Sequence, residues 1–277
     1  MIHKAKTEVL AKRRRREERM RTLQLTIFAV FISTSLANAG TIVLSGDGNI
    51  GDFINGSAGA PVLAGNSTFY SNLLGTGTNV VIEGPTVGAY TSDEYEAEAA
   101  IAAYYTGLGD TVVQVAAGSV TAATLTGANL FISDLNDTGF PGAEVSAISS
   151  LLSGGGTALF EGEFTPYDAG ADALINAALS ALGSTMSLNQ DEQDCGFQTA
   201  TGSQIGSTPL DAGISAFGYG CVSTVTGGTA VFSTMGGAAF MAEQTTTTAT
   251  PEPSTVVLTL GGGFLMMIGR RRCGIKR

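Results

Sequence analysis

The sequence predicts an α/β domain in which helices cover both faces of a mostly parallel sheet, a three-layer Rossmann-like (flavodoxin-like) sandwich. Between residues 40 and 244, short apolar runs alternate with helical segments of about 10–15 residues, which is typical of βαβ units. Glycine-rich turns separate most of these segments. A body of roughly 200 residues is long enough to bury one sizeable core.

The expected strands are short runs rich in β-branched and other apolar residues. In chain order they are 41–44, 79–82, 112–115, 128–132, 157–160, 220–225, 229–233 and 238–241. The expected helices are 69–74, 92–109, 142–152 and 168–182. Ser92 is a suitable N-cap, and the acidic residues after it favour a helix N-terminus.

The N-terminus predicts export. Residues 23–36 form an apolar segment, and Ala37-Asn38-Ala39 follows it as an A-x-A cleavage site for signal peptidase. Residues 1–39 are therefore expected to be a signal peptide, with Gly40 as the first mature residue. Because the basic stretch before the apolar segment is unusually long, we expect translation to start at Met20. A nucleic-acid-binding arm is the alternative, but cleavage would discard it.

The C-terminus, residues 251–277, combines three elements in a fixed order. Pro251, Glu252 and Pro253 come first and favour an extended backbone. An apolar helix is expected at about 254–269, and its apolar run of about 13 residues spans roughly 20 Å as a helix, short of a bilayer core of about 30 Å. A basic tail, 270–277, follows; its first residues are Arg270, Arg271 and Arg272.

These three elements resemble the PEP-CTERM sorting signal of Gram-negative bacteria. The resemblance implies an exported protein that is held transiently in the inner membrane and processed by an exosortase. A weak helix beside an extended motif suits removal, and the Thr-rich segment 245–250 would link it to the body. The alternative is a permanently membrane-anchored periplasmic protein whose tail is never cut.

The body lacks basic side chains altogether. All 14 Lys and Arg residues lie in 1–39 and 270–277, and the single His is His3. The body keeps 20 Asp and Glu residues, so its formal charge is −20. This composition excludes nucleic acid as a partner, a Ser-His-Asp triad, a His-ligated zinc and a Schiff-base lysine. The charge favours divalent cations or basic partners, or serves solubility alone.

Cysteine usage fits an oxidising compartment. The body contains two cysteines, Cys195 and Cys221, which predict one disulfide. A free catalytic cysteine is the alternative, but the body offers no base to lower its pKa.

Part of the body resembles the class I glutamine amidotransferase-like core. The resemblance lies in a strand at 130–133, a helix at 143–152, a glycine-rich turn and a strand at 157–160. It implies the same α/β fold. The catalytic Cys and His of that group have no counterpart here, because Glu161-Gly162-Glu163 follows the last strand. The resemblance therefore implies a member that is not an amidotransferase.

The first candidate site is the loop SGDGNIGD. Asp47, Asn49 and Asp52 place oxygen ligands at near-alternating positions, which suits Ca²⁺. The same residue types also form ordinary turns, so a structural connector is the alternative.

The second candidate site is a group of acids that follow two expected strands: Asp134, Asp137, Glu161 and Glu163. In an open parallel sheet these strand ends meet in one crevice. Such a cluster can bind Ca²⁺ or perform glycosidase-like acid/base chemistry. Scattered, solvated loop acids are the alternative.

Two functions follow. The favoured one is a non-enzymatic protein of the cell envelope or extracellular matrix with a display, adhesion or binding role. Its partners would be signal peptidase, an exosortase, the inner membrane and an extracellular polysaccharide. The other is a carboxylate-based hydrolase that acts on glycans.

Overall fold

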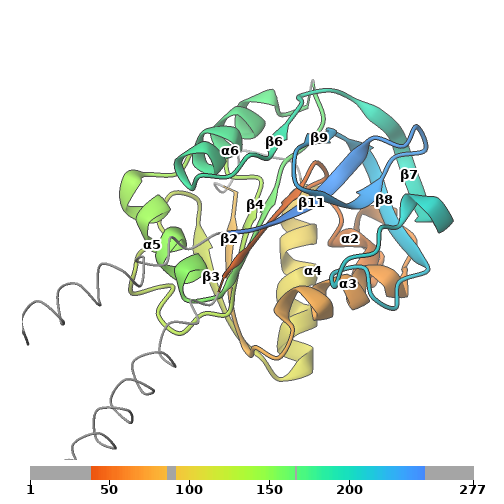
Figure 1. The fold of residues 1–277 in the computed structure, drawn as a ribbon. Helices are drawn as coiled ribbons and strands as arrows, with labels where there is room; N and C mark the ends of the chain where they lie inside the picture. The colour runs from red at the N-terminus through yellow and green to blue at the C-terminus, as the bar shows by residue number, and fades with distance from the viewer. Residues whose placement is uncertain (1–38, 86–91, 166, 247–277) are drawn as a thin grey trace, which may run out of the picture. The chain divides into compact units, whose positions relative to one another are not determined.

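A seven-stranded sheet runs through the molecule in the order β10-β11-β1-β5-β4-β2-β3 (Figure 1). The computed structural model describes residues 39–85, 92–165 and 167–246, all within the compact unit Asn38–Thr248. Five strands are parallel: β1 (Thr41–Ser45), β2 (Asn79–Gly84), β3 (Thr111–Ala116), β4 (Leu130–Asp134) and β5 (Thr157–Glu161). The predicted mixed α/β fold with a mostly parallel sheet is confirmed.

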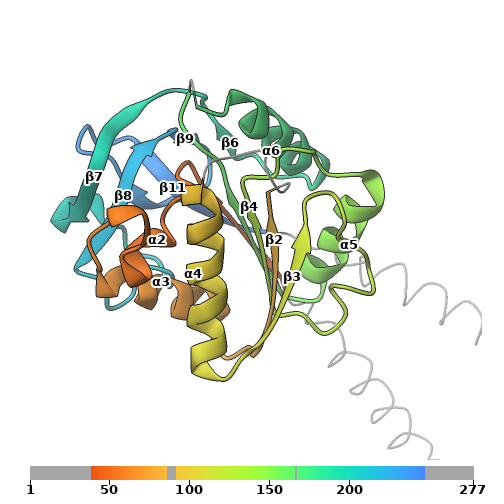
Figure 2. The same ribbon diagram turned by 180° about the vertical axis from the view of Figure 1, so that it is seen from behind.

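Helices cover both faces of this sheet (Figure 2). One face carries α2 (Asp52–Asn55), the short η1 (Ser57–Gly59), α3 (Ala64–Leu74) and α4 (Ser92–Leu108). The other face carries α5 (Gly142–Ser153) and α6 (Ala169–Ala181). Asp168 caps α6 by accepting a hydrogen bond from the Ala171 amide, which fixes the start of that helix.

Alternate residues of the parallel strands pack into two separate hydrophobic cores. On the α3/α4 face, Val43, Ile132 and Leu159 join one fully buried cluster. On the α5/α6 face, Leu44 and Phe160 join the other. The strands are therefore apolar on both sides, as expected for a parallel sheet that is covered on both faces.

The chain path changes face at two places along the carboxyl edge of the sheet. The connections from β1 to β2 and from β2 to β3 use the α3/α4 face, and the return connections to β4 and β5 use the other face. A single crossover handedness requires this change of face when the direction reverses. Adjacent strands β1 and β5, and likewise β4 and β2, thus send their next segments to opposite faces, where open α/β sheets bind ligands.

Antiparallel structure follows α6. Two strands extend the sheet beyond β1, namely β10 (Thr229–Ser233) and β11 (Ala239–Thr245). A hairpin of β7 (Gln193–Thr201) and β8 (Ala216–Val222) packs on the α3 face, with η2 (Gly202–Gln204) after β7. The remaining pair is β6 (Ser187–Leu188) with β9 (Val225–Thr226). The predicted disulfide between Cys195 and Cys221 is confirmed and joins the hairpin strands.

Several boundaries differ from the expectations. Helix α3 begins at Ala64 instead of 69, and β4 ends at Asp134 and not at 132. Strand β8 spans Ala216–Val222, whereas the expected strand was 220–225. Strands β6 and β7 and helix α2 were not predicted. Strand β10 has the expected bounds.

The described residues contain no helix that is both long and apolar enough to cross a membrane. The predicted signal peptide up to residue 38 and the predicted sorting signal lie outside the described residues.

One buried side chain ties α3 to the segments around the crevice. Asn66 Nδ2 donates to the carbonyls of Ile50 (3.0 Å) and Gly218 (2.9 Å), and its Oδ1 accepts the Gly218 amide at 2.8 Å. Gly65 allows this close approach, because a Cβ there would collide with the Ala216 carbonyl of β8. Helix α3, the loop after β1 and the hairpin thereby form one packed unit.

Asn66→Ala should lower the free energy of unfolding by about 2–4 kcal/mol, because it leaves buried backbone groups without partners. Urea denaturation of the variant and of the unaltered protein measures this difference. Asn72→Ala is the control, because Asn72 of α3 also donates to two carbonyls, those of Leu210 and Ala212, but is more exposed. A loss at Asn66 no larger than at Asn72 would contradict the anchoring role.

Candidate functional site

Acidic side chains meet at the carboxyl edge of the parallel strands. Glu161, the last residue of β5, pairs in register with Ser45 of β1 on one side and Asp134 of β4 on the other. Asp134 and Glu161 follow Ile132 and Leu159 by two residues, so strand alternation directs both to the α3/α4 face. We call Asp47, Asn49, Asp134, Glu161 and Glu163 the crevice cluster.

Asp134 is the cluster member whose side chain makes the fewest hydrogen bonds. Its side chain is fully buried, and neither carboxylate oxygen has a hydrogen-bond partner. The next residue, Leu135, is buried with φ of 47°, a left-handed conformation that is unusual for leucine. The Leu135 amide donates to the Glu161 carbonyl at 3.1 Å, which fixes this turn against β5. The chain thus holds an unpartnered carboxylate in place through a strained turn.

Only one of the two carboxylate oxygens of Glu161 has a hydrogen-bond partner. Tyr70 of α3 donates its hydroxyl to Glu161 Oε1 at 2.9 Å, and the other oxygen, Oε2, is buried without a partner. The tyrosine is itself fully buried and bonded to nothing charged except this glutamate. Helix α3 therefore positions one oxygen of Glu161 and leaves the second available.

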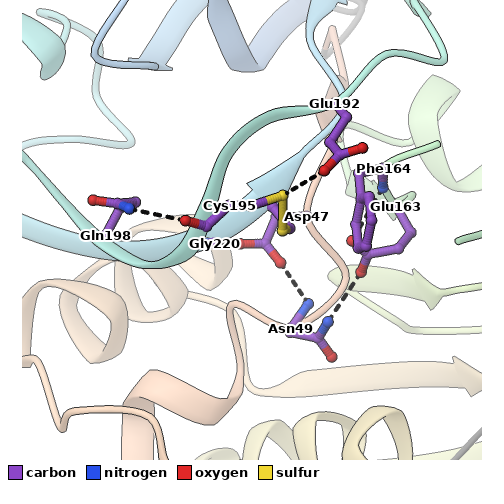
Figure 3. The surroundings of a disulfide bond; sticks show 9 residues. Asp47, Asn49, Glu163, Phe164, Glu192, Cys195, Gln198 and Gly220 are labelled. Atoms are coloured by element: carbon purple, nitrogen blue, oxygen red, sulfur yellow. Dashed lines mark hydrogen bonds between the residues drawn. A yellow bond between two sulfur atoms is a disulfide. The ribbon is translucent and has the colours of Figure 1, made fainter. Parts of the chain in front are cut away.

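The loop after β1 brings Asp47 and Asn49 to Glu163. Asp47 accepts backbone amides with both oxygens, from Asn49 and from Gly220 of β8, each at 2.8 Å. Asn49 Nδ2 donates to Glu163 Oε2 at 3.0 Å. Figure 3 shows the Asn49 nitrogen turned toward Glu163 and its oxygen turned away, and that oxygen is buried without a partner. The disulfide lies beside this loop and restrains β8 next to Asp47.

The remaining predicted residues are not part of the crevice cluster. Asp52, in α2, is buried and accepts the Ser57 hydroxyl at 2.7 Å, and its charge acts on Asp47 and Asp134. Asp137 is partly exposed on the loop after β4. Ala39 is exposed and Gly40 is buried, whereas Ala37 and the tail residues 251–253 and 270–272 lie outside the described residues.

Two contributors to the crevice were missed. Tyr70 lies within an expected helix, but nothing in the sequence ties it to a strand end 91 residues away. Glu98 was attributed to the charge pattern of a helix N-terminus, yet its charge acts on Asp134. A Cβ on Gly84, at the end of β2, would collide with the Glu98 carboxylate. This glycine is the sequence signal that indicates a close approach.

A second acidic group, also missed, lies on the opposite face of the sheet. Glu83 of β2 accepts the Ser133 hydroxyl (2.9 Å), Asn136 Nδ2 (3.0 Å) and the Gly118 amide (2.8 Å). Burial, followed by the neighbouring Glu83, raises the pKa of Glu144 to about 9. Glu144 is therefore a neutral acid at neutral pH.

Burial is the main electrostatic influence throughout the crevice cluster. It raises the pKa values of Asp134, Glu161 and Glu163 well above their ordinary range, and neighbouring acids add to the effect. Burial also raises the pKa of Asp47 to about 7, against the opposing effect of two amide hydrogen bonds. Chemically, the cluster can hold protons or a cation, since the body has no basic side chain to pair with it.

A second group of potential metal ligands in the described part of the chain includes the disulfide. Within the described residues, three acidic or cysteine ligand atoms approach within 4.8 Å of one another only at Glu192, Cys195 and Cys221. The two sulfur atoms there are joined in the disulfide, so they cannot act as thiolate ligands.

Stability of the metal-free protein should fall as pH rises. The folded state keeps the proton on Asp47 and Asp172 up to about pH 7 and on Glu144 up to about pH 9. The unfolded chain releases these protons near about pH 4. The folded state therefore binds more protons in between, and this stabilisation, complete below about pH 4, is lost progressively up to about pH 9.

Urea denaturation midpoints in buffers containing a chelator, from about pH 5 to about pH 9, measure this trend. A constant or rising midpoint over that range would show that the buried acids are ionised at little cost.

Comparison with known proteins gives no match. No protein-family model, curated protein or solved structure is similar to this chain. The function is therefore argued from the residues of this chain alone.

Proposed function

We propose that residues 40–246 are an exported domain, delivered to the cell envelope or released outside the cell when an exosortase processes the PEP-CTERM-like tail. Its role there is non-enzymatic display, adhesion or binding, and an extracellular polysaccharide is its expected partner. The proposal combines the two terminal signals with a body whose first and last strands pair with each other.

The single observation that carries the proposal is how the two ends of the body meet. Strands β1 and β11 pair antiparallel from Thr41 opposite Thr245, and the Thr246 amide donates to the Gly40 carbonyl at 2.8 Å. Gly40 is buried against the carbonyls of Leu152 and Gly156, where a Cβ would not fit. Both expected cuts therefore fall just outside the last backbone hydrogen bonds of the body, so neither cut removes part of the sheet.

Two further properties support a location outside the cytoplasm. The Cys195–Cys221 disulfide is a bond that oxidising compartments favour. The body also carries 20 acidic and no basic side chains, which favours solubility and opposes binding to anionic lipid.

The burial of the crevice cluster favours a binding role over glycan hydrolysis. Asp134, Glu161 and Glu163 have fully buried side chains. A glycosidase needs its two carboxyl groups on either side of a substrate bond, with room for a sugar ring. Side chains enclosed to this degree are better suited to holding a small ion than a polysaccharide.

We further infer that the body is a flavodoxin-like sandwich of the glutamine amidotransferase-like kind without catalytic residues. The order β3-β2-β4-β5 corresponds to the flavodoxin-like order 2-1-3-4, and β1 occupies the place of the fifth strand. Glu161, Gly162 and Glu163 stand where a nucleophile would follow a strand.

Intact-mass measurement on protein from the membranes and the medium of its host tests the sorting proposal. We expect a species that begins at Gly40 and ends near Pro253, because both cuts leave the β1–β11 pairing whole. A protein that still carries residues 270–277 would instead be a permanently anchored periplasmic protein.

The hydrolase alternative is tested separately. Glu161→Gln with Glu163→Gln should leave glycan processing by cells or by purified protein unchanged. The measurement is release of reducing ends from the exopolysaccharide of the host. Release that the unaltered protein causes and the double variant does not would replace the binding role with an enzymatic one.

A further inference from the structure

We propose that the crevice cluster binds one Ca²⁺ ion, held by the carboxylates of Asp134 and Glu161 with Asn49 as a neutral oxygen ligand. The inference goes beyond the sorting proposal and does not depend on it. It starts from four buried side-chain oxygens in this region that have no hydrogen-bond partner: Asp134 Oδ1 and Oδ2, Glu161 Oε2 and Asn49 Oδ1.

These oxygens need a positive partner that the chain does not supply. Buried polar atoms in native proteins almost always have a partner, and an isolated buried charge is costly. The body has no Lys, Arg or His. A proton on Asp134 would provide one donor, but it would leave the other carboxyl oxygens unpartnered, and the Asn49 oxygen accepts only. A cation serves all four oxygens at once.

Neighbouring contacts restrain two of the ligands. The Tyr70 hydroxyl donates to Glu161 Oε1, and the buried Oε2 has no hydrogen-bond partner. Glu163 holds the Asn49 nitrogen, so the Asn49 oxygen points away from Glu163 (Figure 3). The neighbours of both ligands thus fix their orientation, as outer contacts do in built metal sites.

The oxygens and their burial favour Ca²⁺ over other ions. The ligands are carboxylate and amide oxygens, which suit hard cations. Mg²⁺ usually keeps several water molecules, and the fully buried Asp134 and Glu161 leave little room for them, whereas Ca²⁺ accepts irregular protein-oxygen shells at about 2.3–2.6 Å. The ion would lie between the ends of β1, β4 and β5.

The two carboxylate ligands are neighbours in the sheet. Asp134 and Glu161 pair in register on β4 and β5, and the charge of Glu161 acts on Asp134. Two carboxylates this close repel each other unless a proton or a cation compensates their charge. Glu98 approaches from α4 beside Gly84, is only partly buried, and acts electrostatically on Asp134. It therefore adds negative charge near the ligands, which favours a cation there.

Titration with Ca²⁺ and with Tb³⁺ tests the site on the whole protein in chelator-treated buffer. Because the chain has no Trp and Tyr70 contacts a ligand, excitation of tyrosine should sensitise Tb³⁺ luminescence. Ca²⁺ should displace Tb³⁺ and show a dissociation constant of about 10⁻⁴–10⁻³ M in calorimetry, as extracellular sites do. Saturating Ca²⁺ should also raise the melting temperature by about 5 °C.

Matched variants separate this site from general acidity. Asp134→Asn and Glu161→Gln should each weaken Ca²⁺ binding at least about tenfold, since each removes a charged ligand. Glu144→Gln is the control, because Glu144 is equally buried and unpartnered but lies on the opposite face. It should bind Ca²⁺ as the unaltered protein does.

Folding of the variants is checked by their melting temperature in chelator. Replacement of a buried carboxyl group by its neutral amide should leave that temperature unchanged or higher. Absence of Ca²⁺ heat and of displaceable Tb³⁺ luminescence in the unaltered protein would overturn the proposal. Equal weakening in folded Glu144→Gln and Asp134→Asn would overturn it as well. Binding is measured on protein from either membranes or medium, so its failure is independent of how the tail is processed.

Discussion

The structure depends on one constraint: a body with 20 acidic side chains must bury several of them without a single basic residue. Backbone amides and hydroxyl groups replace the missing cations. The Gly220 amide binds Asp47, and the Glu163 amide binds Asp172. These bonds also hold the hairpin and α6 against the sheet. At Asp134 no such donor is present, and the fold is left with a carboxylate that only solution species can neutralise.

The chain path explains why the acids gather where they do. Connections that change face at β1/β5 and β4/β2 leave the carboxyl ends of those strands uncovered by a direct crossover. Glu161, at the end of β5, then faces Tyr70 of α3 and the charge of Asp47 in the loop after β1. Asn66 ties helix α3 to the β7–β8 hairpin, and the disulfide joins the two hairpin strands. The same elements that stabilise the domain therefore enclose the cluster.

Short apolar runs in the sequence predict the parallel strands of the core well, because these strands are buried on both faces and therefore apolar throughout. Strand β7 was missed since QDCGFQTAT is polar and mostly exposed, with no alternation to indicate a face. Helix α3 extends N-terminally through Gly65 and Asn66, two residue types that are typical of turns. They lie in the helix here because both contact β8. The strand-end acids follow from topology, but the partnership of Tyr70 with Glu161 depends on tertiary packing that no local pattern encodes.

The central claim is that the buried acids take their positive partner from solution. Carbon-13 NMR of the Asp134 carboxyl carbon, in chelator and then with saturating Ca²⁺, measures this most directly. The account predicts that burial holds the pKa of Asp134 well above its ordinary range in chelator, and that Ca²⁺ ionises the carboxyl. An ionised Asp134 in chelator, unchanged by Ca²⁺, would contradict the account.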